Sequence, residues 1–126
     1  MKFSMTKQKF INQWLRHFAN GVSKIQIESY VKDQYIWHVF SYDLISDEKL
    51  LMGDEARNAF DQADKSACIC CDMFGNSGVR EGLSGCDSSK MIEEHFTELY
   101  VVAKDYSWTY IKTHENGSCG PYFYRK

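Results

Sequence analysis

The chain has 126 residues, the length of one ordinary domain, and its formal net charge of −2 makes it neither strongly basic nor strongly acidic. Hydrophobic residues make up 44% of the sequence and proline occurs once, which excludes intrinsic disorder and predicts a packed core. No apolar run approaches the roughly 20 residues that cross a bilayer, and the N-terminus lacks a signal-peptide pattern, so we expect a single cytoplasmic domain over residues 1–126 with no membrane partner.

The N-terminal third predicts two helices and a strand. Over residues 4–18 a polar cap is followed by apolar residues at helical spacing, and Asn20-Gly21 ends this amphipathic helix. A capping-box pattern predicts a short second helix over residues 23–31. The run Tyr35–Ile45 is aromatic and branched on both alternating faces, which predicts a strand that is covered on both sides.

The middle of the chain predicts helices and a strand joined by a long loop. Gly53-Asp54-Glu55 opens a helix whose first-turn acids suit the positive end of the helix dipole, and its apolar stripe of alanines implies close packing. Ser66–Phe74 is expected to be a buried strand. Gly75–Gly85 contains four of the eight glycines and almost no periodicity, which predicts a loop. Polar residues at 87–89 can each cap a following helix that has Leu99 on its apolar side.

The C-terminal segment predicts a β-hairpin. After a strand at Tyr100–Ala103, an aromatic and β-branched run reaches Asn116-Gly117, the strongest short hairpin signal in the sequence, and returns through Pro121 into a second aromatic run. Because proline cannot donate a hydrogen bond in a central ladder, the second hairpin strand is expected to lie at the sheet edge or to start late. The expected fold class is α+β, a single layer of helices packed on a mixed, mainly antiparallel sheet that ends in this hairpin.

Charge and cysteine content narrow the classes of partner. Residues 1–32 carry six Lys or Arg against one Glu, whereas residues 33–99 carry five against fourteen Asp or Glu. The basic segment lacks any zinc-finger or RNA-recognition pattern, so nucleic acid is not an expected partner. Three of the five cysteines lie in the Ser66–Phe74 strand, where neighbouring thiols point to opposite faces, so reduced thiols are expected rather than disulfides.

Two parts of the sequence carry polar residues that suit a binding site. On the Tyr35–Ile45 strand, His38 and Tyr42 share a face and could form a pocket floor, although His38 also suits a neutral core imidazole. At the end of the first hairpin strand, polar residues lie beside the tight turn, where binding residues concentrate, although the same residues could satisfy turn amides. On the helix that Gly53 opens, the Asp54 carboxylate could orient a reacting group and the Arg57 guanidinium could bind an anion. The candidate binding residues are His38, Tyr42, Asp54, Arg57, Thr113, His114 and Glu115.

No cofactor, metal ion or catalytic residue is assigned from the sequence. The strand cysteines lack the paired spacing of zinc ligands, and the glycine-rich segment matches no phosphate-binding motif. A Cys119–His114 nucleophile pair is geometrically possible, but it lacks a third group that would orient the imidazole. Whether the protein is an enzyme therefore stays open, and the incomplete set of catalytic groups favours a non-catalytic role.

Five short motifs follow one another along the chain, namely Trp37–Ser41, Gly53–Arg57, Trp108–Tyr110, Thr113–Glu115 and Gly120–Phe123. In this combination the chain resembles a family of small bacterial single-domain proteins known only as a domain of unknown function. The resemblance implies a cytosolic bacterial α+β protein. It transfers no catalytic residue, because none is assigned in that family.

Two functions from different classes remain open. The first is a non-catalytic protein-binding module, antidote-like or an accessory subunit, which is favoured by small size, an acidic middle segment and many aromatic side chains. The alternative is a small-ligand-binding protein, or an enzyme, that uses a pocket beside the C-terminal hairpin with His38 or His114 as acid or base. In that pocket Glu115 or Asp54 would orient the imidazole, and Arg57 would bind an anionic group.

Overall fold

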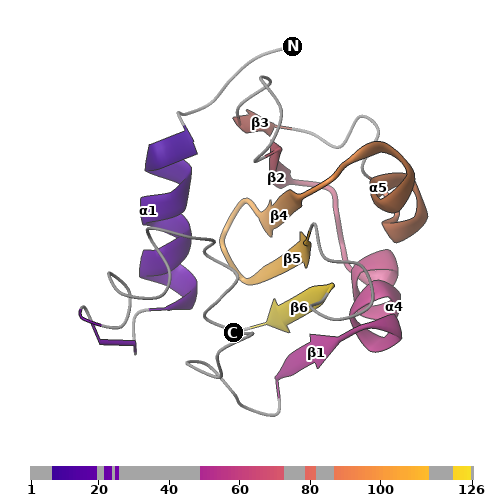
Figure 1. Cartoon of the computed structure of the whole chain (residues 1–126), viewed down its shortest axis with the longest axis horizontal. Helices are drawn as coiled ribbons and strands as arrows, with labels where there is room; N and C mark the ends of the chain where they lie inside the picture. The colour runs from indigo at the N-terminus through magenta and orange to yellow at the C-terminus, as the bar shows by residue number, and fades with distance from the viewer. Residues whose placement is uncertain are drawn as a thin grey trace.

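In the residues that the computed structural model describes, namely 7–19, 22–23, 25, 49–72, 79–81, 87–113 and 121–125, the chain forms one six-stranded antiparallel sheet with helices on both faces (Figure 1). This architecture confirms the α+β class. The helices are α1 (Lys7–Phe18), α4 (Asp54–Gln62) and α5 (Ser89–His95). The strands are β1 (Leu50–Met52), β2 (Cys68–Asp72), β3 (Val79–Glu81), β4 (Leu99–Ala103), β5 (Trp108–Lys112) and β6 (Tyr122–Arg125).

The strands follow the order β1-β6-β5-β4-β2-β3, and each neighbouring pair is antiparallel. β5 and β6 pair with Tyr110 opposite Phe123, which confirms the predicted C-terminal hairpin, although its tip at Asn116-Gly117 lies outside the described residues. β6 starts at Tyr122, one residue after Pro121, so the late start is confirmed. The alternative of an edge position is wrong, because β1 pairs with the other side of β6.

The central strands β4 and β5 determine the layers, because all five residues of each strand are buried. Successive side chains of a strand point to opposite faces, so both faces of the sheet need a cover. α1 covers one face, and α4 with α5 covers the other, which corrects the expected single layer of helices (Figure 1). The α1 side is filled chiefly by Phe10, Trp14, Phe18, Tyr100, Val102 and Ile111, and the other side by Phe60, Ile92, Leu99, Val101, Tyr110 and Phe123.

A buried relay of hydrogen bonds fixes α1 to the middle of the sheet. The Trp14 indole N–H donates to the Thr109 hydroxyl at 3.0 Å, and that hydroxyl donates to the Val101 carbonyl at 3.0 Å. Trp14 and Thr109 are both fully buried. Because a buried donor that loses its acceptor costs about 1–3 kcal/mol, the relay favours one position of α1 on the sheet over its alternatives.

The N-cap residue of α4, Gly53, has a backbone conformation that only glycine adopts readily. Gly53 has φ +62° and ψ −134°. Its N–H donates to the Pro121 carbonyl at 3.0 Å, and its own carbonyl accepts the Arg57 N–H at 3.0 Å. Two of the motifs seen in the sequence, Gly53–Arg57 and Gly120–Phe123, are thus joined in the fold. The start of α4 is thereby held next to the start of β6.

Most predicted elements of the described part are confirmed, with two corrections. α1 and α5 form where the periodicity predicts them, and the Ser88 side chain caps α5 by accepting the Met91 N–H at 3.2 Å. Leu99 is not part of α5, which ends at His95, because Leu99 opens β4 and pairs with its neighbours in the sheet. The segment expected to be a glycine-rich loop contains β3 at Val79–Glu81, which is stabilised by pairing with β2 rather than by any local pattern.

One further strand was not predicted, and two predicted elements lie wholly or partly outside the described residues. β1 was not expected, because a three-residue strand is too short to show a period and is stabilised by its ladder with β6. The expected strand Tyr35–Ile45 lies outside the described residues. Of the expected helix over residues 23–31, only Ser23 and Ile25 are described.

Replacing Thr109 with valine, which has nearly the same shape, is expected to lower the free energy of unfolding by about 1–3 kcal/mol. The Trp14 indole N–H would then be buried without the acceptor seen here. Urea denaturation of both proteins measures the difference. As a matched control, Thr97→Val at an exposed threonine should change the free energy of unfolding by no more than about 0.5 kcal/mol.

The relay also predicts that its two partners are energetically coupled. Trp14→Phe removes the donor, so the double variant Trp14→Phe with Thr109→Val should lose about 1 kcal/mol less than the sum of the two single losses. Strictly additive losses would contradict the relay.

Candidate functional site

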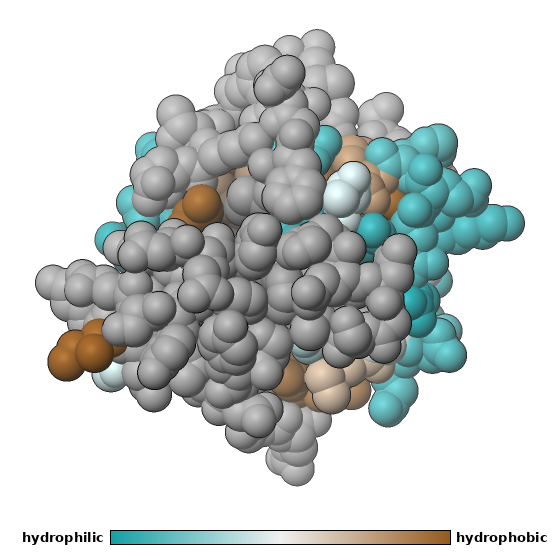
Figure 2. All heavy atoms as spheres, viewed as in Figure 1, coloured by the Kyte–Doolittle hydropathy of each residue, from teal (hydrophilic) through white to brown (hydrophobic). Residues whose placement is uncertain are grey.

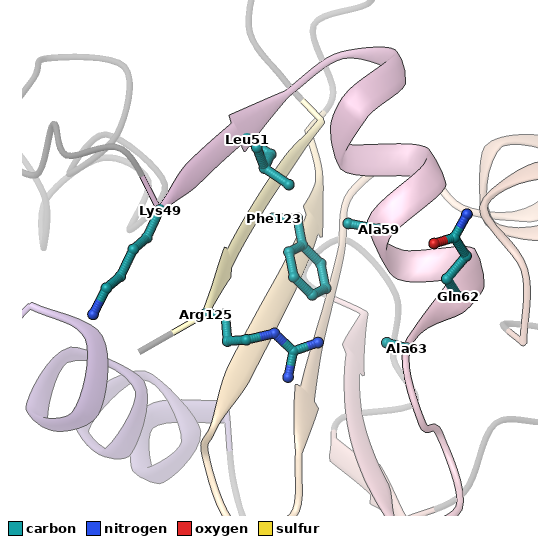
Figure 3. Close-up of a pocket in the computed structure, with 7 residues that line it drawn as sticks. All are labelled: Lys49, Leu51, Ala59, Gln62, Ala63, Phe123 and Arg125. Atoms are coloured by element: carbon teal, nitrogen blue, oxygen red, sulfur yellow. The ribbon is translucent and has the colours of Figure 1, made fainter.

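A hollow of about 540 Å³ opens between α4 and the strands β1 and β6 (Figure 3). Its volume lies in the range of roughly 300–1,000 Å³ that is typical of small-molecule sites. Leu51 and Phe123, which are cross-strand partners, contribute the sheet side, and α4 contributes the opposite wall. We call it the first hollow. It is lined by Lys49, Leu51, Ala59, Gln62, Ala63, Phe123 and Arg125.

The first hollow exists because α4 presents small side chains to this part of the sheet. Ala59 lies in α4 and Ala63 is its C-cap four positions later, and Figure 3 shows both directed towards Phe123. Both alanines remain half-buried, whereas Ala56, in the same stripe, is fully buried. The close packing expected from the alanine stripe is therefore confirmed at Ala56, and the next two turns leave space instead.

The Arg125 guanidinium is the charged group that distinguishes the first hollow. Its Cζ lies 5.5 Å from the centroid of the Phe123 ring, and Figure 3 shows the guanidinium directed towards the side of α4. Within the described ranges of the chain, no carboxylate lies within ion-pair distance of it. Lys49 also lines the hollow, but in Figure 3 its side chain extends away from α4. A guanidinium that is held against an aromatic ring without a neutralising carboxylate is suited to bind an anion.

A second hollow, of about 400 Å³, adjoins the first. Arg125 lines both, and Ala63 of the first hollow is followed in the chain by Asp64 of the second. Trp108 of the second hollow stacks on Phe123 of the first, with 5.5 Å between ring centroids and 24° between ring planes. One pair of stacked rings thus connects the two hollows. The second hollow is lined by Asp64, Ser66, Ala67, Ala103, Lys104, Asp105, Ser107, Trp108 and Arg125.

The family model described as Domain of unknown function (DUF4275) matches residues 1–123 of the chain. The chain belongs to this family. The family resemblance expected from the sequence is therefore confirmed. Compared with curated proteins and with solved structures, the chain has no match. Since membership of DUF4275 carries no activity, the function has to be argued from the geometry of the site.

In this DUF4275 protein, the predicted residues Asp54 and Arg57 form an ion-pair cluster between α4 and α5 and line neither hollow. Arg57 Nη1 donates to Asp54 Oδ1 at 2.7 Å, and Arg57 Nε donates to the Glu93 carboxylate of α5. The hydrogen bond to Glu93 raises the pKa of Arg57. Because two carboxylates neutralise the Arg57 guanidinium, it is less available to an external anion than that of Arg125.

The remaining predicted residues are only partly placed. Thr113 follows β5 and is 3% exposed. His38, Tyr42, His114 and Glu115 lie outside the described residues, so their roles stay predictions. In the described segments, no three His, Cys, Asp or Glu side chains are grouped so that they could hold a metal ion. No helix in those segments combines the length and the hydropathy needed to cross a membrane.

The residues that line the first hollow were missed as site residues by the sequence analysis. Phe123 belongs to a recognised motif and Ala59 to the helical stripe, so both were visible as residues of the core. Arg125 carried a usable signal, because it follows Phe123 by two positions on a strand and therefore shares its face. The sequence does not show that this face meets the alanines of α4.

Tyr110 places a buried hydroxyl near the Arg57 cluster. Its ring stacks on Phe60 with 4.3 Å between centroids, and the residue is 0% exposed. Its hydroxyl has no hydrogen-bond partner among the described residues. Burial, with a smaller contribution from the Glu93 charge, raises the pKa of Tyr110. The Tyr110 phenol is therefore neutral in the folded protein at physiological pH.

Tyr110→Phe keeps the stacked ring and removes the hydroxyl. At neutral pH the free energy of unfolding is expected to stay the same or to rise by up to about 1 kcal/mol, because no described hydrogen bond is lost. Above about pH 10 the unfolded wild-type chain releases a tyrosine proton that the folded chain retains, so wild-type stability falls as pH rises. The advantage of the variant should grow by about 1 kcal/mol between about pH 8 and pH 11 in urea denaturation. A constant difference would contradict the raised pKa.

Proposed function

We propose that this protein binds a small molecule that combines an anionic group with an apolar body, and that the first hollow is the binding site. The observation that carries the proposal is the Arg125 guanidinium, which lies over the Phe123 ring beside this hollow without a described carboxylate partner. This is the small-ligand alternative of the sequence analysis, with Arg125 instead of Arg57 as the anion-binding group. The expected setting is the bacterial cytoplasm that the family resemblance implies.

The apolar body of the ligand would lie between α4 and the sheet. Leu51, Phe123 and the two half-buried alanines offer apolar surface there, and each Å² removed from water contributes about 25 cal/mol. The anionic group would meet Arg125, whose planar fork can donate two parallel hydrogen bonds to a carboxylate. The hollow therefore offers an apolar contact and a directional charge contact to the same ligand.

The composition of the first hollow favours binding over catalysis. Lys49 lines it and is of a type that can transfer protons or attack a substrate, but the described lining contains no His, Cys, Asp or Glu that could activate this lysine. The proposed role is accordingly non-catalytic.

Isothermal titration calorimetry with 3-phenylpropionate and with hexanoate tests the proposal. At least one of these carboxylates is expected to bind the wild-type protein with a Kd below about 1 mM. Arg125→Gln should weaken that binding by about tenfold or more, because it removes a charge-assisted hydrogen-bond pair. Ala59→Leu should abolish binding, because the larger side chain would occupy the first hollow.

Two matched controls separate the site from general effects. Arg16→Gln makes the same change of charge at an exposed residue of α1, on the opposite face of the sheet, and Asn58→Leu adds a leucine to the exposed side of α4. Both controls should bind like the wild type. Equal losses in Arg125→Gln and Arg16→Gln, unchanged binding in Ala59→Leu, or no binding of either carboxylate to the wild type would each overturn the proposal.

A second candidate function, the protein-binding module of antidote-like or accessory type, is favoured by the surface of α4 and α5. Figure 2 shows hydrophilic residues gathered on the side of the molecule where Figure 1 places these two helices. A concentration of negative charge would steer a basic partner towards this surface. The exposed carboxylates of the two helices are Asp54, Glu55, Asp61, Glu93 and Glu94.

A pull-down from the native host separates the two candidates, because only the protein-binding candidate expects the wild type to retain a stoichiometric partner. A double variant, Glu55→Lys with Glu94→Lys, should fail to retain a basic partner that the wild type and Arg125→Gln both retain. If no stoichiometric partner is retained by the wild type, the protein-binding candidate is refuted.

A further inference from the structure

We infer that the two hollows form one site for an α-amino acid with an apolar side chain, in which the second hollow receives the ammonium group. The inference rests on the proposed function. It narrows the ligand from any amphipathic anion to a dipolar one.

The two hollows are continuous in their walls. Arg125 lines both, and the wall formed by α4 passes from Ala63 in the first hollow directly to Asp64 in the second. On the sheet side, the stacked rings of Phe123 and Trp108 provide a surface beneath the Arg125 side chain. A ligand group bound at Arg125 would therefore lie beside both hollows, and in the proposed complex one small molecule extends into both.

The two hollows differ in charge. The described lining of the first contains the cations Lys49 and Arg125 and no carboxylate, whereas the second contains the carboxylates Asp64 and Asp105 together with Lys104 and Arg125. Arg125 shares the second hollow with Asp64, yet these two side chains form no ion pair with each other. A guanidinium and a carboxylate that line one hollow without pairing leave room for a ligand that carries both charges. Arg57 offers the contrast, since its guanidinium is already paired within the protein.

Local hydrogen bonds hold the carboxylates at the rim of the second hollow. Asp64 Oδ1 accepts the Ser66 N–H at 3.0 Å, and Asp105 Oδ1 accepts the Ser107 N–H at 3.0 Å. The two loops that carry them are tied together, because the Lys104 N–H donates to the Ala67 carbonyl at 3.0 Å. The bonds from Ser66 lower the pKa of Asp64, so this carboxylate is ionised at neutral pH. Asp64 thus presents a negative charge in a fixed position, as an ammonium group requires.

The order of the groups matches the three substituents on the α-carbon of an amino acid. The carboxylate would bind Arg125, which lies where the hollows meet. The apolar side chain would enter the first hollow, against Leu51 and the alanines of α4. The ammonium group would then point into the second hollow, towards Asp64. A ligand without the ammonium group could use only two of these three contacts.

Isothermal titration with four related probes tests this assignment on the full chain. The probes are L-phenylalanine, N-acetyl-L-phenylalanine, L-phenylalaninamide and 3-phenylpropionate. L-Phenylalanine is expected to bind about tenfold more tightly than each of the others, because each of them lacks one of the two charges. Asp64→Asn should weaken the binding of L-phenylalanine about tenfold and leave that of 3-phenylpropionate unchanged. The asparagine oxygen can still accept the Ser66 N–H, so the turn is preserved.

Asp87→Asn is the matched control, because Asp87 is exposed and lines neither hollow. It should bind all four probes like the wild type. If 3-phenylpropionate binds and L-phenylalanine binds no more tightly, the amino-acid assignment is overturned while the proposed function stands. If L-phenylalanine binds more tightly but Asp64→Asn does not weaken it, the ammonium position is overturned. If none of the four probes binds, the inference is overturned, and if hexanoate does not bind either, the proposed function is overturned with it.

Discussion

The structure depends on the burial of β4 and β5 on both faces at once. All their residues are buried, so the sheet is stable only when a separate layer packs on each side. On one side the contact is specified by the hydrogen bonds from Trp14 to Thr109 and from Thr109 to Val101. Because a buried polar relay tolerates little displacement, it selects one docked position for α1, which apolar packing alone would leave less well defined.

The two layers cover the sheet unequally, and the candidate site is a consequence of this difference. α1 packs with large rings, chiefly Phe10, Trp14 and Phe18, which fill their face of the sheet. α4 contributes one large ring, Phe60, and otherwise alanines, so its cover is incomplete beside β1 and β6. The hydrogen bond from the Gly53 N–H to the Pro121 carbonyl holds the N-cap of this helix next to the start of β6. The α4 wall of the first hollow is therefore attached to the sheet at the start of the helix.

Sequence reasoning succeeded where local chemistry determines the structure. The period of α1, the Ser88 cap and the aromatic, β-branched run of β5 are each contained in a few consecutive residues. It failed where distant pairing decides, as for β1 and β3, whose three residues are stabilised by their ladders. Distant contacts also explain why the sequence analysis predicted a different arginine for the candidate site. Arg57 was read as an anion-binding residue, but Glu93 lies 36 residues away and neutralises it, whereas the partners that define the surroundings of Arg125 come from α4 and β1.

The buried cysteines of β2 can report when the helices that cover them detach from the sheet. Cys68 and Cys70 are covered by the α4 and α5 layer, whereas Cys71 is covered by the α1 layer. A shielded thiol reacts with an alkylating reagent only while its cover is displaced. The rate of alkylation at Cys71 therefore reports how often α1 detaches from the sheet. The rate at Cys68 or Cys70 reports the detachment of the α4 and α5 layer. Mass spectrometry of the modified strand can order these two events without an introduced label.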